Sequence, residues 1–420
     1  MRIELPHRSE RFGAVRIHGV QEVWELDSGG EPASVDDNAW HSIHHVPSTT
    51  INDYERRMAI VVPVKGERLK VLDGVLSGIP HDCLIILVSN SERDPVDRYR
   101  MEKETLRRFC RLASRSAQLI HQRDPGIAAA FAEAGMPEIL EDDGLVRDGK
   151  GEGMLIGLAL AKLSGREFVG FIDADNYVPG AVYEYVQAYA SGFHLAESPF
   201  SMVRISWRSK PKIQAGRLFF NRWGRSSQVT NRFLNLLLSS YSGFGTEIIA
   251  TGNAGEHAFS LDLALRMQFA AGFAVEPYEY INVFERYGGV LASPDKDVMK
   301  AGVEIFQIET RNPHFHENKG ADHVQEMRLQ ALNVLYHSPI SVQDVRDEIA
   351  DFLRQEGVIG EGEEPPQELL YPPMSGIDWD TFGRVLGDKS ESFRQIEKVR
   401  PASLERQTPI PEIPDSESKG

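Results

Sequence analysis

The stretch from Phe171 to Tyr177 constrains the fold most strongly, because an apolar run there ends in two closely spaced aspartates. The residues from Phe168 to Ile172 are predominantly apolar and predict a buried β-strand. A proline and a glycine then precede a helical pattern that starts at Ala181. We therefore expect Asp173 and Asp175 at the carboxyl end of a strand, where open α/β sheets bind their ligands.

Two carboxylates at a strand end suit a hard divalent cation that keeps some of its waters and binds substrate phosphate oxygens. The same pair is also compatible with a cap on the following helix that faces solvent. On its own, the D-x-D motif does not decide between these two interpretations.

Composition limits the class of protein. The chain has 420 residues, of which 41% are hydrophobic and 26% charged, as in ordinary globular enzymes. That length suits one large α/β domain or two smaller ones. The formal net charge of −16 argues against a nucleic-acid partner, so an anionic substrate would need local basic groups.

Cysteine use and hydropathy indicate a cytoplasmic protein. The two cysteines, Cys83 and Cys110, make a disulfide framework or a zinc cluster improbable. The first ten residues contain no apolar core of signal-peptide length. No segment approaches 18 consecutive apolar residues, so we expect no membrane span.

Strand-like and helix-like segments alternate as far as Asp175, which predicts a βαβ sheet and therefore an α/β fold. In this part of the chain we expect strands at Ala14–Ile17, Val20–Leu26, Met58–Val64 and Leu84–Val88, and helices at Leu69–Leu76, Glu104–Leu119 and Met154–Leu163.

The second half has a mixed pattern. We expect a strand at Ser201–Trp207, a strand or turn at Leu218–Trp223, helices at Arg232–Ser239 and Val324–Leu335, and a polar loop at Thr251–His257 before a helix from Ala258. The expected divisions are N-terminal strands and a polar insert (residues 1–55), a half that ends in the D-x-D motif (56–200), a second half that contains the two histidines (201–360), a linker and helix (361–400) and a disordered tail (401–420).

Polar groups follow the first two strands of the expected sheet. Pro63, Lys65 and Glu67 end one strand, and a nucleotide base and ribose could be held there. A solvated loop explains the same residues about as well. Ser89 follows the next strand in a run of small hydrogen-bonding side chains, which are also common in turns.

The loop Arg147–Gly153 (R-D-G-K-G-E-G) is suited to an oxyanion. Its three glycines let backbone N–H groups approach a phosphate, and the following helix offers its positive N-terminal end. Arg147 and Lys150 add positive charge. The spacing matches neither a Walker loop nor G-x-G-x-x-G, and a glycine-rich helix start without a ligand is the alternative.

Two further clusters carry possible chemistry. The segment Arg204–Arg225 concentrates basic and aromatic residues and could meet an anionic substrate, although a solvated basic face is the simpler interpretation. His314 and His316 are two positions apart and would share one face of an extended chain. One of these imidazoles could join Asp175 on a Mn²⁺- or Mg²⁺-type ion, although such a histidine pair is usually structural or exposed.

Several motifs in order resemble the mannosyl-3-phosphoglycerate synthase family: M-A-I-V-V-P-V-K-G-E, L-V-S-N-S-E-R, I-H-Q-R-D-P-G, R-D-G-K-G-E-G-M, V-G-F-I-D-A-D-N-Y-V-P-G-A-V, T-G-N-A-G-E-H-A and I-E-T-R-N-P-H-F-H-E. The resemblance extends from about Phe12 to about Pro366. It matches least well in the polar insert near Ser28 and in the tail from Pro401.

This resemblance implies a nucleotide-diphospho-sugar transferase fold of the glycosyltransferase A type, which is a Rossmann-like mixed sheet flanked by helices. Residues 56–200 would then be the nucleotide-sugar half and residues 201–360 the acceptor half. The implied reaction moves mannose from GDP-mannose to the 2-hydroxyl of 3-phosphoglycerate, with retention and a divalent cation, Mg²⁺ or Mn²⁺. The product would lead to mannosylglycerate, a compatible solute, after a separate phosphatase step. No nucleic-acid or membrane partner is implied, and a homodimer stays open.

The resemblance also implies roles for individual residues. Asp173 and Asp175 would be the catalytic carboxylates, with Asp175 the direct metal ligand, and His314 or His316 would complete the metal shell. The remaining implied positions are Pro63, Lys65, Glu67, Ser89, Lys150 and Asp173 at the nucleotide, and Arg147, Lys150, Glu152, Thr251, Gly252 and Asn253 at the sugar and acceptor.

Other functional classes give different expectations. A double displacement would need a carboxylate nucleophile, and no residue is identifiable in that role. A haloacid-dehalogenase-type phosphatase would place its D-x-D early in the chain, and a sugar-1-phosphate nucleotidyltransferase would carry an N-terminal glycine-rich signature after its first strand. A binding protein without catalysis is a further alternative.

Overall fold

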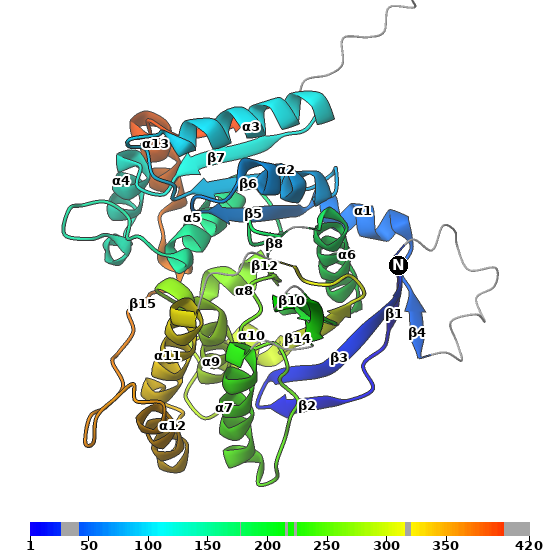
Figure 1. Ribbon diagram of the computed structural model, residues 1–420, viewed down its shortest axis with the longest axis vertical. Helices are drawn as coiled ribbons and strands as arrows, with labels where there is room; N and C mark the ends of the chain where they lie inside the picture. Colours follow the sequence, from blue (N-terminus) through cyan, green and yellow to red (C-terminus); the bar gives the residue numbers. More distant parts are fainter. Residues whose placement is uncertain (27–41, 177, 215–216, 222–224, 316–320, 399–420) are drawn as a thin grey trace, which may run out of the picture.

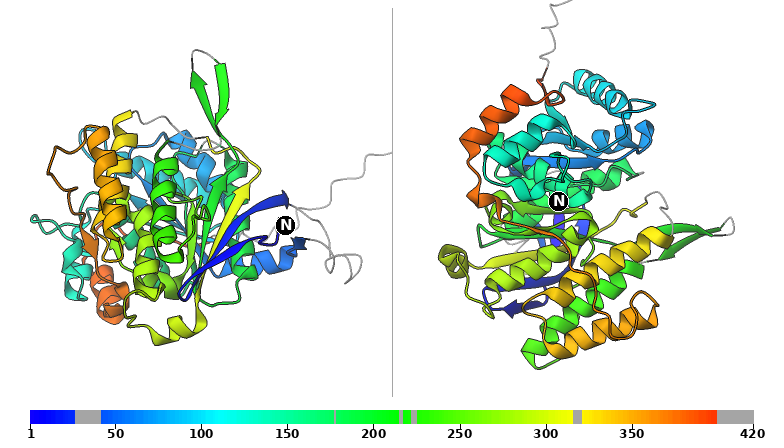
Figure 2. Two further views of the ribbon diagram at one scale, coloured as in Figure 1. Left: turned by 90° about the horizontal axis from the view of Figure 1, so that it is seen from below. Right: turned by 90° about the vertical axis from the view of Figure 1, so that its left-hand side faces the viewer.

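The computed structural model describes residues 1–26, 42–176, 178–214, 217–221, 225–315 and 321–398. Within these residues a twelve-stranded sheet forms the centre, with strand order β16-β7-β6-β5-β8-β12-β9-β14-β3-β1-β4 and β2 paired to β3. Helices lie on both faces of this sheet, and the β10–β11 hairpin projects away from the body (Figures 1 and 2).

The strands of the central sheet are β1 (Arg2–Glu4), β2 (Ser9–Phe12), β3 (Val15–Glu25), β4 (Ile43–His45), β5 (Met58–Val64), β6 (Leu84–Ser89), β7 (Ala117–His121), β8 (Phe168–Phe171), β9 (Ser201–Trp207), β12 (His257–Ser260), β14 (Val303–Thr310) and β16 (Arg394–Ile396). Two small sheets pair β10 (Lys210–Gln214) with β11 (Arg217–Asn221), and β13 (Phe269–Ala270) with β15 (Leu370–Tyr371).

The α-helices are α1 (Ser48–Arg56), α2 (Leu69–Gly78), α3 (Arg98–Ala113), α4 (Pro125–Glu133), α5 (Lys150–Leu163), α6 (Pro179–Leu195), α7 (Arg225–Ser242), α8 (Leu261–Arg266), α9 (Val275–Tyr287), α10 (Lys296–Ala301), α11 (Ala321–His337), α12 (Gln343–Gln355) and α13 (Trp379–Lys389). Short 3-10 turns lie at η2 (Pro137–Ile139), η3 (Gly272–Ala274) and η4 (Met374–Gly376). No helix in the described part of the chain is both long enough and apolar enough to cross a membrane.

The apolar run of β5 is explained by burial on both faces of the sheet. Its strand pairs in parallel with β6 on one side and β8 on the other. Val61 belongs to the core that contains α4 and α5, whereas Ile60 and Val62 belong to the core that contains α2, α3 and α6. Parallel pairing therefore brings the carboxyl ends of β5, β6, β7 and β8 to one edge.

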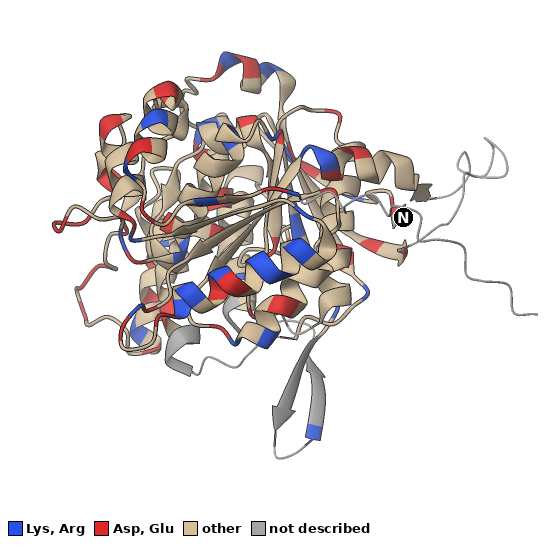
Figure 3. Cartoon of the chain, turned by 90° about the horizontal axis from the view of Figure 1, so that it is seen from above, with Lys and Arg blue, Asp and Glu red and all other residues tan. Residues whose placement is uncertain are grey.

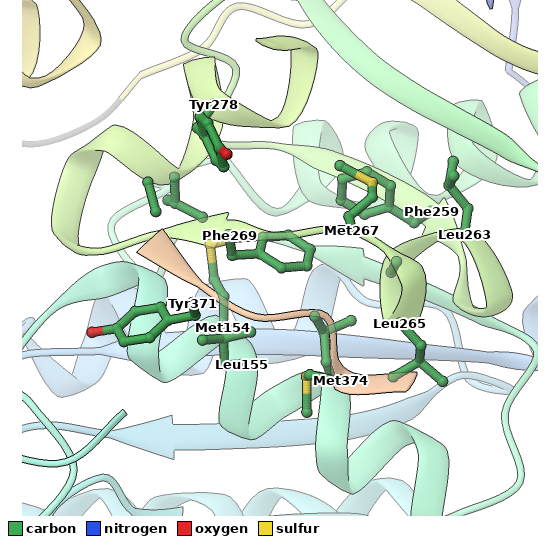
Figure 4. Packing of buried hydrophobic residues seen from close by; sticks show 14 of the residues in the cluster. Met154, Leu155, Phe259, Leu263, Leu265, Met267, Phe269, Tyr278, Tyr371 and Met374 are labelled. Carbon is green, nitrogen blue, oxygen red and sulfur yellow. The ribbon is translucent and has the colours of Figure 1, made fainter. Parts of the chain in front are cut away.

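The C-terminal segment packs against the helix that follows the glycine-rich loop. Met154 and Leu155 of α5 share a core with Phe269 of β13, Tyr371 of β15 and Met374 of η4 (Figure 4). Further along, α13 packs on α4, and β16 pairs with β7 at the edge of the central sheet. Residues near the end of the described chain therefore stabilise the half that holds Asp173.

Most expected elements are confirmed, with small differences at their ends. The strands at Met58–Val64 and Ser201–Trp207 have the expected bounds. The two strands expected between residues 14 and 26 form the single strand β3, and the segment near Leu218 is a strand rather than a turn. The division at residue 200 stays a prediction, and the tail at 401–420 lies outside the described residues.

Two expected helices are present, but their expected bounds were wrong. The helix expected over Glu104–Leu119 ends at Ala113, because Ser114 takes a left-handed conformation with φ 53°, and β7 then begins at Ala117. The helix expected from Ala258 is preceded by the strand β12, whose residues are all buried. That strand pairs with β8 and with β9, so tertiary pairing on both sides determines its conformation.

Two helical glycines give a test of packing. A Cβ at Gly157 of α5 would lie 2.3 Å from Cγ1 of Val61, whereas a Cβ at Gly387 of α13 would meet no atom within 4 Å. We expect Gly157→Ala to lower the free energy of unfolding by about 1–3 kcal/mol through overpacking. Gly387→Ala should be neutral or raise it by up to about 1 kcal/mol. Urea denaturation measures both, and equal effects would contradict this packing.

Candidate functional site

Lys150 lies between two acidic side chains at the carboxyl edge of the sheet. It is the first residue of α5, and its Nζ lies 2.6 Å from Oδ1 of Asp173 and 2.6 Å from Oε1 of Glu276. Burial alone would lower the pKa of Lys150, but the two carboxylates raise it well above its ordinary value. The glycine-rich loop, the D-x-D strand end and the first turn of α9 therefore meet at one fixed positive charge.

Gly255 permits this close approach. A Cβ at position 255 would lie 2.5 Å from Oδ2 of Asp173 and 3.2 Å from Nζ of Lys150. A side chain there would displace the Asp173–Lys150 ion pair. The loop from Thr251 to Glu256 is therefore packed directly against the D-x-D motif.

Asn176 and Glu256 connect the D-x-D turn to the interior. The Asn176 amide donates hydrogen bonds of 2.9 Å to the Asp173 carbonyl and 2.9 Å to Oε1 of Glu256. Glu256 is wholly buried, and Asp175 is 6% exposed. Neither Asn176 nor Glu256 was predicted as a site residue, although both lie inside motifs that resemble the family.

His314 lies near this buried carboxylate. Its Nδ1 is 3.9 Å from Oε2 of Glu256 and 3.2 Å from the Tyr185 hydroxyl, and its ring stacks on Trp207 with centroids 4.3 Å apart. His314 is therefore held next to Glu256, the carboxylate that also binds Asn176 of the D-x-D turn. His316, the other predicted ligand, lies outside the described residues.

The donor chemistry of this region fits a divalent cation. Carboxylate oxygens of the D-x-D motif, together with the nearby imidazole of His314, are ligands that Mn²⁺ accepts, and Mg²⁺ accepts the oxygens. Within the described ranges, no group of three or more His, Cys, Asp or Glu side chains is arranged to hold an ion. Asp175 and His314 thus stay predicted ligands.

The predicted nucleotide loop is held by charged contacts. Nζ of Lys65 lies 2.7 Å and 2.9 Å from the two oxygens of Asp148, and Asn90 donates to the same carboxylate at 2.5 Å. Burial opposes ionisation of Asp148, but these hydrogen bonds lower its pKa. Oε2 of Glu67 accepts a 2.6 Å hydrogen bond from the Lys65 backbone N–H. Asp148 was not predicted as part of this site.

Ser89 is turned toward the helix α3 rather than toward solvent. Its hydroxyl donates a 2.6 Å hydrogen bond to Glu102, as does the hydroxyl of Ser91. Ser91 Oγ also accepts a 2.8 Å hydrogen bond from the Gly66 backbone N–H. Burial raises the pKa of Glu102, a residue that no sequence motif indicated. Through these contacts Ser89 and Glu102 support the loop that carries Pro63, Lys65 and Glu67.

The remaining residues of the glycine-rich loop differ in environment. The side-chain amide of Gln122 donates hydrogen bonds to the carbonyls of Arg147 (2.6 Å) and Gly149 (3.0 Å) and so fixes the loop. Glu152 is 1% exposed and accepts a 2.5 Å hydrogen bond from the Tyr371 hydroxyl. Burial raises the pKa of Glu152. Its carboxylate therefore binds the C-terminal segment, and its predicted substrate contact stays a prediction.

Arg204 holds the loop that contains Thr251, Gly252 and Asn253. The guanidinium is wholly buried, forms an ion pair with Glu279 of α9, and donates to the carbonyls of Thr251 (3.0 Å) and Glu276 (3.1 Å). The expectation that Arg204 belongs to a basic surface was wrong, because a buried carboxylate and backbone carbonyls satisfy its donors. In the described part of the chain, Lys and Arg are interspersed with Asp and Glu along the outer helices (Figure 3).

Thr251 and Gly252 are also held by side chains. The Thr251 hydroxyl lies 2.8 Å from the Tyr280 hydroxyl and donates a 2.9 Å hydrogen bond to Gln307. The Gly252 backbone N–H donates a 2.7 Å hydrogen bond to Oδ1 of Asn231 in α7. The structure thus brings the predicted acceptor loop next to the D-x-D turn, and it adds Asn231, which no sequence motif indicated.

The mixed sheet, with a D-x-D turn after β8 and a lysine at the start of α5 beside it, makes this an α/β protein with a charged site at the carboxyl ends of its parallel strands. The sequence model described as mannosyl-3-phosphoglycerate synthase matches residues 5–386. The mannosyl-3-phosphoglycerate synthase of Pyrococcus furiosus is 47% identical over 394 residues, which cover 94% of this chain and 99% of that protein. The enzyme of that name from Aeropyrum pernix is 37% identical, with 94% and 99% covered. The chain belongs to the mannosyl-3-phosphoglycerate synthase family.

Solved structures of glucosyl-3-phosphoglycerate synthase from Mycobacterium tuberculosis are more distant. A complex with Mn²⁺, UDP and glucosyl-3-phosphoglycerate is 18% identical, with a TM-score of 0.46, and covers 79% of this chain and 97% of that one. A complex with Mn²⁺, UDP-glucose and phosphoglyceric acid is 19% identical, with a TM-score of 0.47 and coverage of 79% and 96%.

Substitution of two arginines compares how much a buried and an exposed ion pair contribute to the free energy of unfolding. Arg204→Met should lower the free energy of unfolding by roughly 3–5 kcal/mol, because it leaves the buried Glu279 carboxylate without its guanidinium partner. Arg232→Met removes an exposed pair with Glu348 and should cost at most about 1 kcal/mol. Chemical denaturation of both variants measures the difference. A cost below about 1 kcal/mol for Arg204→Met would contradict its assigned role.

Proposed function

We propose that this chain transfers mannose from GDP-mannose to the 2-hydroxyl of 3-phosphoglycerate, with retention of anomeric configuration. The observation that carries the proposal is the ion-paired Lys150 between Asp173 and Glu276, in a chain of the mannosyl-3-phosphoglycerate synthase family. A buried, permanently charged lysine at a helix N-terminus suits a phosphorylated leaving group. The product would serve mannosylglycerate synthesis.

The reaction requires stabilisation of the leaving group more than activation of a nucleophile. The bond between the anomeric carbon and the donor phosphate oxygen breaks, and the acceptor oxygen bonds to the same face of the sugar. The acceptor proton passes to the departing diphosphate. Lys150 and the backbone N–H groups at the start of α5 stabilise the negative charge that develops on that diphosphate. We assign no covalent nucleophile.

The remaining residues have supporting roles in this proposal. Asp175 and His314 would hold a divalent cation, which supplies positive charge to the GDP leaving group when bound. Lys65 and Glu67 would contact the nucleoside, and Thr251, Gly252 and Asn253 would contact the acceptor. Because Lys150 has two carboxylate partners, it would keep its ion pair with Glu276 if Asp173 contacted the donor.

The direct test is release of GDP from GDP-mannose with Mg²⁺ or Mn²⁺ present. We expect release that depends on 3-phosphoglycerate, together with formation of the α-linked product, which NMR identifies. Phosphate release from 3-phosphoglycerate alone would favour the phosphatase alternative. Turnover with another phosphorylated acceptor but not with 3-phosphoglycerate would overturn the proposed acceptor.

Glu276 gives a mutational test of the lysine site. Glu276→Gln keeps the size of the side chain but replaces a charge-assisted hydrogen bond to Lys150 with a neutral one. We expect kcat/KM for GDP-mannose to fall about tenfold or more, since hydrogen bonds to charged groups contribute about 1.5–3 kcal/mol. Steady-state kinetics measure this change.

Glu285→Gln is the matched control. Glu285 is a buried carboxylate on the same helix, but its partners are Ser338 and Tyr278 instead of Lys150. We expect kcat/KM of this variant to stay within about twofold of the parent. Equal losses in the two variants would show that general damage to α9, rather than the Lys150 contact, causes the effect.

A further inference from the structure

One groove of this acidic protein is rich in cationic side chains. It runs between α3 and β16, which both lie beside β7. A pocket of about 280 Å³ and a second pocket of about 190 Å³ share Lys103 and Arg394 in their walls. Arg107 also lines the larger pocket, and Arg93 and Arg100 line the smaller one. Because the whole chain has a formal net charge of −16, this local excess of positive charge requires an explanation.

Most of these cations have no ion-pair partner. Among the described residues, no carboxylate oxygen lies within 4.0 Å of the charged nitrogens of four of them: Arg93, Arg100, Lys103 and Arg394. Arg107 pairs with Glu104 at 3.6 Å, and both of these side chains are largely exposed. Like charges that line one groove repel one another, and an anion between them removes that repulsion.

Three carboxylates also line the groove, but they do not neutralise these cations. Asp97 caps α3, where its side chain accepts a 2.9 Å hydrogen bond from the Arg100 backbone N–H. Glu391 and Glu397 are exposed, and within the described part of the chain neither forms an ion pair. Cations therefore outnumber carboxylates in the lining by five to three, and most of the cationic donors are unused.

The cations approach the groove from two sides. Arg100, Lys103 and Arg107 follow one another at spacings of three and four residues in α3, so they share one face of that helix. Arg394 lies on β16, and Arg93 lies in the loop before α3. An anion in the groove would therefore have positive charge on both sides.

The backbone that carries these cations is held by buried contacts. The Tyr99 hydroxyl donates a 2.6 Å hydrogen bond to the Ser392 carbonyl, which joins α3 to the segment before β16. Asp124 accepts a 2.7 Å hydrogen bond from the Ser392 backbone N–H, and the His121 backbone N–H donates to the Ser392 hydroxyl at 3.0 Å. The Arg93 guanidinium lies 5.6 Å from the centre of the Tyr99 ring. Fixed walls with unused donors are the arrangement expected of a preorganised binding site.

We propose that the groove between α3 and β16 binds a small anion that carries two or more phosphate groups. Each pocket takes one phosphate, and Lys103 and Arg394 lie between them because both residues line both pockets. Arginine binds phosphate oxygens through paired N–H groups, and such charge-assisted hydrogen bonds are stronger than neutral ones. No lining residue has a role in the proposed sugar transfer, so this inference does not depend on the proposed function.

Inorganic anions of increasing charge test the proposal by calorimetry on the full chain. Phosphate, pyrophosphate and tripolyphosphate are titrated without a divalent cation. We expect one site that binds pyrophosphate at least about tenfold more tightly than phosphate, because a second phosphate adds charge-assisted contacts. Equal affinities for the three anions would show non-specific adsorption to the surface and would overturn the inference.

The double variant Lys103→Gln, Arg394→Gln removes the two cations that the pockets share. We expect the Kd for pyrophosphate to rise about tenfold or more for each residue, since hydrogen bonds to charged groups are lost. Without an anion, the melting temperature should stay the same or rise, because neither residue has an ion-pair partner among the described residues. A folded double variant that keeps the parent Kd would contradict the proposal.

The double variant Arg108→Gln, Arg111→Gln is the matched control. It removes the same charge from α3, but neither residue lines either pocket. We expect its Kd for pyrophosphate to stay within about twofold of the parent, since exposed charges outside the groove are screened by salt. Equal losses in the two double variants would show that net charge, rather than the groove, determines binding.

Lys150→Gln distinguishes the groove from the proposed catalytic site. This variant should lose release of GDP from GDP-mannose but keep the Kd for pyrophosphate within about twofold. If Lys150→Gln lost pyrophosphate binding and the groove variant kept it, the anion would bind at the catalytic site and the inference would fail. Groove-dependent binding of pyrophosphate by a chain that never releases GDP would support the inference while the proposed function fails.

Discussion

The buried ion pair between Arg204 and Glu279 is the interaction on which the rest of the site depends. A guanidinium without solvent exposure is stable only when its donors are satisfied, and here a carboxylate and backbone carbonyls satisfy them. Oε1 of Glu279 also lies 2.9 Å from Nε2 of His257, which begins β12. A strand of the central sheet, the acceptor loop and the helix that carries Glu276 are thereby held together.

The strand-end carboxylates could be predicted because their signals are local. A near-continuous apolar run is enough to indicate a strand that is buried on both faces, and Asp173 follows such a run directly. Parallel pairing then places the D-x-D turn and the loop around Lys65 at one edge of the sheet. Seven short motifs also resembled those of the family, and the comparisons confirm membership of that family over nearly the whole chain.

The partners of those residues could not be predicted, because they come from distant parts of the chain. Glu276 meets Lys150 across 126 residues, and Asn231 meets Gly252 across 21. Because arginine side chains are usually exposed, we expected Arg204 on the protein surface. Its buried partner, Glu279, follows only from tertiary packing. The helix expected through Leu119 was wrong for a related reason: its apolar pattern continues past the left-handed Ser114 into a strand.

The last strand of the sheet has a consequence for how the chain folds during synthesis. The edge of β7 (Ala117–His121) is covered by β16 (Arg394–Ile396), which leaves the ribosome more than 270 residues later. Until then, the buried residues of β7 form an open strand edge, which is a template for pairing with another chain. The strands β5 to β7 are thus translated long before the outer edge of β7 is covered, and the interval between the two is a period of exposure to aggregation.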